Sequence, residues 1–156
     1  MMKYIIEFEG FQLQNTFVFK EVVIYCLNTK HVEHFFVRSP PKMVLSATDQ
    51  AIINYCERNL HKIKWSSGRQ CMSYVKNLIK DFDVNTVVYT KGLQKSKLLQ
   101  SMFKHLSVYD LEELGCPKFN KVISPNESVC PLPFHSRSVC CAHRKALAFA
   151  KFLESK

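Results

Sequence analysis

A chain of 156 residues can form one domain with a hydrophobic core, and we expect a single domain over residues 1–156. Four glycines and six prolines argue against long disordered tracts and against a turn-rich β-sandwich. The formal net charge of +9 favours polyanionic partners, because cations that meet phosphates release counterions. No apolar run approaches about 18 residues and no signal-peptide cleavage site follows the N-terminus, so we expect an intracellular protein of cytoplasm or nucleus, neither secreted nor in a membrane.

The first half of the chain is predicted to form three strands followed by two helices. Runs of β-branched and aromatic residues joined by short turns indicate an antiparallel meander. A Ser-Ala-Thr segment at 46–48 offers a cap for the first helix, and apolar residues at helical spacing support both helices. The strands are expected at residues 3–8, 17–27 and 34–38, and the helices at 49–60 and 71–82.

The second half alternates strands and helices. The short apolar run TVVY is typical of a central, parallel strand. We expect strands at 86–89 and 108–109, helices at 96–105 and 141–155, and a proline-rich loop at 117–138. The resulting order, βββ-α-α-β-α-β-α, predicts an α/β protein with a mixed sheet flanked by helices.

The seven cysteines are an odd count in a chain without a secretory signal, which argues against a disulfide framework. Cys26, Cys56 and Cys71 lie in apolar-periodic stretches, and we expect them in the core. The remaining four cluster in the C-terminal third with two histidines, and for them metal ligation and plain burial both stay open.

Several local motifs accompany this order of elements. Glu7-Phe8-Glu9 forms an acid-x-acid pair on the first strand, and Glu21 lies inside the apolar run of the second. His143 opens the last helix. Together these features resemble the DnaQ-like 3′–5′ exonucleases, and the resemblance implies their ribonuclease-H-like fold.

The resemblance includes a departure at the catalytic positions. Two-metal hydrolysis needs about four carboxylates around two Mg²⁺ ions. Glu7 and Glu9 supply two, whereas the alignment places Lys95 and Ala148 at the other two positions. We therefore expect a vestigial site without ordinary exonuclease activity. A single-stranded RNA nuclease that uses Glu7 and Glu9 with unconventional partners stays open, as does a protein-interaction module on the same fold.

A second resemblance is to the Maelstrom domain, a degenerate branch of this fold in animal small-RNA silencing factors. It is carried by Phe19-Lys20-Glu21-Val22, by the His/Phe-rich segment 34–41, by Val88-Tyr89-Thr90-Lys91 and by Cys130, His135 and Cys141. It implies binding of single-stranded or structured RNA, a role in piRNA or transposon silencing, and protein partners in a silencing complex.

The Maelstrom family binds a structural zinc ion through a Glu-Cys-His-Cys set. Carboxylate, thiolate and imidazole are ligands that Zn²⁺ takes in a tetrahedron. The implied ligands here are Glu21, Cys130, His135 and Cys141. The spacing departs from the family, which leaves Cys140 and Cys116 open as alternative ligands. Taken on spacing alone, these cysteines would be free thiols.

Basic residues gather where this fold would place its cleft. Lys91, Lys95 and Lys97 surround one strand–helix junction, and Arg144 and Lys145 begin the last helix. The only tryptophan, Trp65, lies in a polar loop and could stack on a base. A solvated lysine face and a tryptophan over the core edge are the alternatives. The clustering favours RNA or DNA binding.

Overall fold

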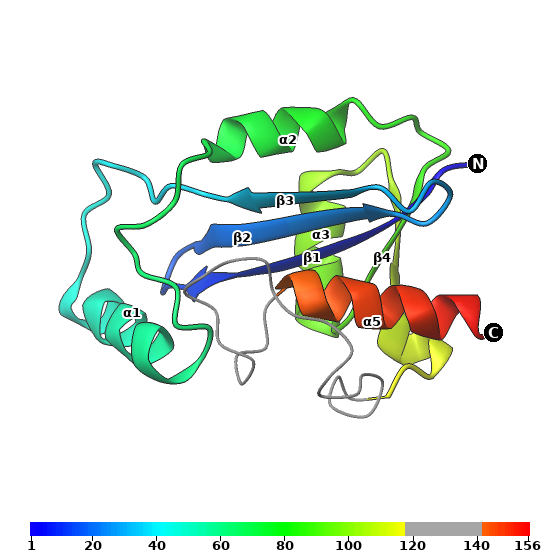
Figure 1. Cartoon of the computed structure of the whole chain (residues 1–156). Coiled ribbons are helices and arrows are strands. Elements are labelled where there is room, and N and C mark those ends of the chain that lie inside the picture. The colour runs from blue at the N-terminus through cyan, green and yellow to red at the C-terminus, as the bar shows by residue number, and fades with distance from the viewer. Residues whose placement is uncertain (118–141) are drawn as a thin grey trace.

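The computed structural model describes residues 1–117 and 142–156, which form one five-stranded sheet with helices on both faces (Figure 1). The strands lie in the order β3-β2-β1-β4-β5. β1, β2 and β3 are antiparallel, and β4 and β5 run parallel to β1. The strands are β1 (Lys3–Gln12), β2 (Phe17–Cys26), β3 (Val32–Phe36), β4 (Val87–Thr90) and β5 (Ser107–Asp110).

The helices cover the sheet from two sides, with α2 and α3 on one face and α5 on the other (Figure 1). On the first face Ile6 and Phe8 of β1 lie in one core with Leu99 and Phe103. None of the described helices is long and apolar enough to cross a bilayer. The helices are α1 (Ala47–Asn59), α2 (Met72–Lys80), α3 (Leu93–Met102), the 3₁₀ turn η1 (Leu111–Leu114) and α5 (Ala142–Glu154).

This architecture confirms the expected α/β mixed sheet and its order of elements. The short apolar strand β4 lies between β1 and the edge strand β5, as its composition predicts. Ser46 is the N-cap of α1, where its hydroxyl accepts a hydrogen bond from the backbone N–H of Asp49 at 3.0 Å. α3 begins three residues earlier than expected, directly after Gly92, whose φ of 113° belongs to the region that favours glycine.

β1 continues beyond the expected end at residue 8, through a bulge. The pairing register with β2 shifts between Glu9 and Gly10. A Cβ atom on Gly10 would lie 2.0 Å from the carbonyl oxygen of Val18, so only glycine fits there. The bulge makes Glu9 the last regular residue of β1 beside the predicted catalytic cleft.

Lys20 is a fully buried lysine in the middle of β2. Its ammonium donates to Ser39 Oγ at 2.9 Å, to the carbonyl oxygen of Trp65 at 2.9 Å, and to the carbonyl of Ser67. Burial lowers the pKa of Lys20 to about 8, although the charge of Glu57 opposes the shift. Lys20 therefore fastens the loop that carries Trp65 to the sheet.

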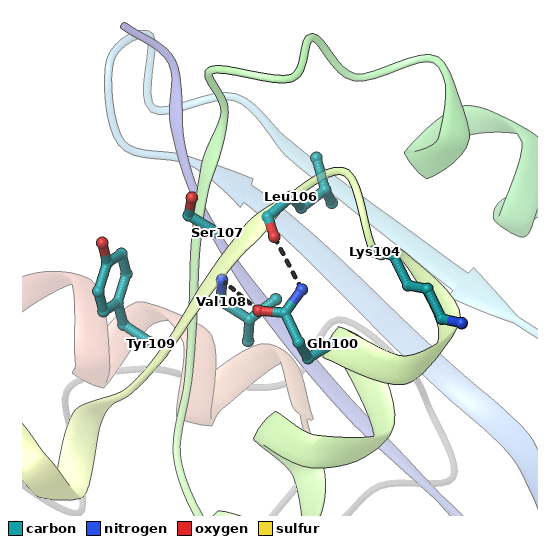
Figure 2. A pocket seen from close by; sticks show the side chains of 6 residues that line it. All are labelled: Gln100, Lys104, Leu106, Ser107, Val108 and Tyr109. Carbon is teal, nitrogen blue, oxygen red and sulfur yellow. Dashed lines mark hydrogen bonds between the residues drawn. The ribbon is translucent and has the colours of Figure 1, made fainter.

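The edge strand β5 is closed by a side chain of α3 (Figure 2). Gln100 donates from Nε2 to the carbonyl oxygen of Leu106 at 2.8 Å and accepts at Oε1 from the N–H of Val108 at 3.3 Å. This amide takes the place of a neighbouring strand, a common way to protect a sheet edge. The adjoining hollow, about 520 Å³ in volume, is also lined by Lys104 and Tyr109.

The cysteine expectations hold for two of the three positions. Cys26 and Cys56 are buried, whereas Cys71 is exposed and the prediction for it is wrong. Cys71 precedes α2 as its N-cap residue instead of lying on the apolar face of that helix. Its sulfur lies 2.9 Å from the hydroxyl oxygen of Ser73.

Candidate functional site: two carboxylates paired with two lysines

Glu7 lies in the middle of β1, where parallel pairing brings it beside the end of β4. Its carboxylate is 1% exposed. One oxygen accepts from Thr90 Oγ1 at 2.6 Å and from the backbone N–H of Lys91 at 3.2 Å. The other lies 3.3 Å from Nζ of Lys95, on α3. Glu7 is therefore a buried acid with both oxygens bound by the protein.

Glu9 projects from the same face of β1, because residues two apart in a strand share a face. Nζ of Lys145, in the first turns of α5, donates to Glu9 Oε1 at 2.5 Å. Burial raises the pKa of the Glu9 carboxyl, but the charges of Lys145 and Lys95 outweigh it and hold that pKa below its usual value. Glu9 is therefore ionised at neutral pH.

The two acids form two ion pairs, Glu7 with Lys95 and Glu9 with Lys145. A hydrolytic two-metal centre needs several carboxylates facing shared cations. Here each carboxylate already has an ammonium group, and Ala148, buried on α5, offers no ligand atom. Within residues 1–117 and 142–156, no three His, Cys, Asp or Glu side chains are placed to hold a metal ion together.

A hollow of about 450 Å³ opens beside these pairs, between the bulge of β1 and the start of α3. Phe8, Phe17 and Leu98 give it apolar walls, and two lysines stand at its edge. Nζ of Lys95 lies 5.2 Å from the centre of the Phe8 ring, a cation–π contact. The full lining is Phe8, Glu9, Gly10, Gln12, Phe17, Gln94, Lys95, Lys97 and Leu98.

Three of the lysines predicted to bind nucleic acid do meet at the cleft, each with an acidic partner. Lys91 pairs with Glu112 at 3.2 Å, in addition to the pairs of Lys95 and Lys145. Lys97 is exposed at the rim of the hollow. A phosphate can reach Lys97 without displacing a carboxylate, whereas at the other three lysines it would compete with one.

The two other residues predicted to contact nucleic acid, Arg144 and Trp65, are buried and half-buried, respectively. Arg144 is 5% exposed on α5, so a phosphate would reach it only after its surroundings move. Trp65 is half-buried, with its ring centre 5.4 Å from that of Phe11 and its side chain against the core cluster at the hairpin end of the sheet. This packing matches the alternative in which the tryptophan covers the core edge.

Glu21, the predicted zinc ligand on β2, is fully buried. One oxygen lies 2.6 Å from Nε2 of His34, and the other accepts from the N–H of Ala142 at 3.0 Å. The His34 ring stacks on His143 with centres 5.2 Å apart, and Nδ1 of His143 is buried without a hydrogen-bond partner among the described residues. Burial lowers the pKa of His143, and His34 adds to this against the opposing charge of Glu21.

The other proposed ligands Cys130, His135, Cys140 and Cys141 lie outside the described residues. Cys116 is buried in the core under α5. A buried carboxylate and an unpartnered imidazole nitrogen are donor groups that zinc accepts. Glu21 is the one proposed ligand of the zinc set that lies in residues 1–117 and 142–156, where no three such side chains are placed to hold a metal ion together.

Sequence reasoning missed several members of both clusters. Thr90 lies in the segment Val88-Tyr89-Thr90-Lys91, but its contact with Glu7 depends on the pairing of β1 with β4, and Glu112 reaches Lys91 from η1. His34 lies in the His/Phe-rich segment 34–41. Its place beside Glu21 follows from the pairing of β3 with β2, in which Glu21 aligns with Phe36, two residues after His34. A correct pairing of these two strands would therefore have been the signal.

No family model matches the chain, and no curated protein matches it. Among solved structures, the chain is similar to the exonuclease domain of Mopeia virus, partially complexed with manganese. The two are 18% identical with a TM-score of 0.65, and the match covers 99% of this chain and 77% of that one. This likeness shows the fold, which is the ribonuclease-H-like fold of an exonuclease domain.

Proposed function

We propose that this chain is a nucleic-acid-binding domain that has lost two-metal exonuclease catalysis, and that its ligand is single-stranded or structured RNA. The observation that carries the proposal is the pairing of Glu7 with Lys95 and of Glu9 with Lys145. In each pair an ammonium group already neutralises a carboxylate that a catalytic metal ion would need. The domain then binds through phosphates and bases without cleaving.

Support for binding comes from the hollow beside the pairs and from the charge of the chain. The hollow combines aromatic walls with Lys97 at its rim, the two elements that bind a single strand without sequence preference. The net charge of +9 adds long-range attraction to phosphates. The Maelstrom resemblance adds RNA, a place in small-RNA silencing and partners in a silencing complex to the proposal.

The binding and cleavage test uses end-labelled single-stranded RNA, structured RNA and DNA with the purified protein, in Mg²⁺ and in Mn²⁺. We expect salt-dependent binding and intact substrate. A ladder of products from the 3′ end that Glu7→Gln abolishes would instead establish an unconventional nuclease. Absence of binding at low salt would leave the fold as a protein-interaction module.

A structural zinc ion is the second part of the proposal, with Glu21, Cys130, His135 and Cys141 as ligands. Support comes from Glu21, a buried carboxylate beside His34 and the start of α5. Such an ion would tie the C-terminal segment to β2 and contribute folding free energy.

Metal analysis of the purified chain tests the zinc. We expect one zinc ion per chain, lost in Cys130→Ser and His135→Ala together with a lower melting temperature. Cys71→Ser is the matched control, because Cys71 is an exposed thiol that is not among the proposed ligands. Zinc-free protein, or variants that melt like the parent, would refute the site.

A further inference from the structure

A second hollow adjoins the one beside the ion pairs. It has a volume of about 360 Å³ and lies between the start of β2, the segment after β3, and helices α2 and α3. The two hollows share Phe17 and Leu98 as lining residues. The two hollows therefore adjoin at Phe17 and Leu98, and together they are called the groove below.

The second hollow carries cations of a different kind from those of the cleft. Arg38 and Lys76 line it from two different elements. In the described part of the chain neither side chain has a carboxylate partner, and no acid lines this hollow. The side chain of Arg38 is hydrogen-bonded to the thiol of Cys71 and helps to lower the pKa of that thiol, a contact that leaves the charge of Arg38 unneutralised. Both cations remain available to an anion.

Apolar side chains form the rest of the second hollow. Phe17 is half-buried and stands against Phe8 and Phe19 with ring centres 5.5 and 4.9 Å away. Met72 and Met102 add polarizable surface opposite it. An aromatic ring between two cationic stretches is the arrangement that receives a base between neighbouring phosphates.

We propose that single-stranded RNA runs through both hollows, with phosphates on Lys97, Arg38 and Lys76 and a base against Phe17. This rests on the proposed function, and it adds a strand path that extends away from the vestigial site. An acidic peptide would satisfy the same cations. RNA fits better, because every nucleotide carries a phosphate and its bases can stack on Phe17.

The test compares affinities of a fluorescent oligouridine for variants of the full chain over a series of salt concentrations. Arg38→Gln with Lys76→Gln is expected to weaken binding roughly tenfold and to flatten the slope of log K against log salt by about 1.4, at about 0.7 for each phosphate on a single strand. Lys3→Gln with Lys104→Gln is the matched control: both lysines are exposed and outside the groove, and the net charge falls equally. We expect the control to change affinity less than twofold.

Phe17→Leu separates the base contact from the phosphate contacts. Stacking on an aromatic ring contributes enough that its loss should weaken binding by about fivefold or more, with the salt slope unchanged. An unchanged melting temperature shows that the variant is folded. Oligodeoxyuridine run in parallel shows whether the groove distinguishes RNA from DNA.

Three outcomes overturn the strand path. If the Arg38/Lys76 double variant and the control double variant bind with equal affinity, the path is refuted although the protein still binds RNA. A loss of affinity in Lys97→Gln would then place that binding at the first hollow. A parent protein that binds no oligouridine refutes both the path and the proposed function. Displacement of RNA by a polyglutamate peptide at similar concentration assigns the groove to an acidic peptide instead.

Discussion

The cleft beside Glu7 and Glu9 and the second hollow differ in whether their cations are paired with carboxylates. In the cleft, Lys95 and Lys145 are each bound to a buried or half-buried carboxylate. In the second hollow, Arg38 and Lys76 lie among apolar side chains and have no carboxylate partner in the described residues. The charge that a ligand meets therefore depends on which cations are already neutralised, and not on how many a segment contains.

The largest effect should follow from breaking the deeper of the two ion pairs. Glu7→Ala removes an acceptor that serves Thr90, the backbone of Lys91 and the ammonium of Lys95. Because its buried donors are left without an acceptor, we expect the free energy of unfolding to fall by about 3 kcal/mol. Denaturant unfolding measures this.

Glu113→Ala, which truncates an exposed acid in the turn after β5, is the control, and it should stay within about 0.5 kcal/mol of the parent. If Glu7→Ala is as stable as the control, the pair does not hold the cleft together, and the contrast between the two regions loses its energetic basis.

Lys20 offers an intermediate arrangement, a buried cation held by neutral oxygens instead of a carboxylate. Lys20→Met keeps the volume but leaves the carbonyl of Ser67 without this donor. We expect a loss of about 2 kcal/mol and faster hydrogen exchange in the loop around Trp65. Lys64→Met, at an exposed position of that loop, should change neither measurement. Unaltered exchange in Lys20→Met would show that the loop is held by its apolar contacts alone.

A smaller stability effect is expected at Thr90, which donates to Glu7 from β4. Thr90→Val is nearly isosteric and removes only the hydroxyl that lies 2.6 Å from the carboxylate. One hydrogen bond to a charged acceptor should account for about 1 to 2 kcal/mol in thermal or denaturant unfolding. A loss as large as that of Glu7→Ala would mean that the hydroxyl, and not Lys95, is the principal partner of Glu7.

Most of the fold follows from local sequence patterns. A few neighbouring residues are enough to predict each of three features: the alternation of strands and helices, the Ser46 cap and the short parallel strand β4. The errors are at element ends. β1 passes Gly10 because a bulge allows the strand to continue, and Cys71 caps a helix that was expected to include it. Both depend on backbone geometry that apolar spacing does not encode.

The site was less predictable, because pairing across the chain decides its chemistry. Lys145 and Glu9 are 136 positions apart, so the sequence shows a free lysine and a free acid where the structure has one ion pair. Arg38 and Lys76 come from separate elements and meet at the second hollow only after the sheet and α2 pack together. The buried Lys20 lies in an apolar strand pattern that gives no sign of its three acceptors.

The smallest predicted effect is a gain, and it tests directly whether pairing silences the cleft lysines. Glu9→Gln removes the charge that faces Lys145 while keeping the shape of the side chain. Without that opposing charge, affinity for single-stranded RNA should rise about threefold at low salt and the salt slope should steepen by about 0.7, the value for one added phosphate contact. Glu33→Gln, on the edge strand β3, makes the same change in net charge away from the groove. If both variants gain equally, the attraction follows net charge, and neutralisation within the cleft has no special role. A gain confined to Glu9→Gln means that the acids of the cleft limit RNA binding, because each one occupies a cation that a phosphate would otherwise use.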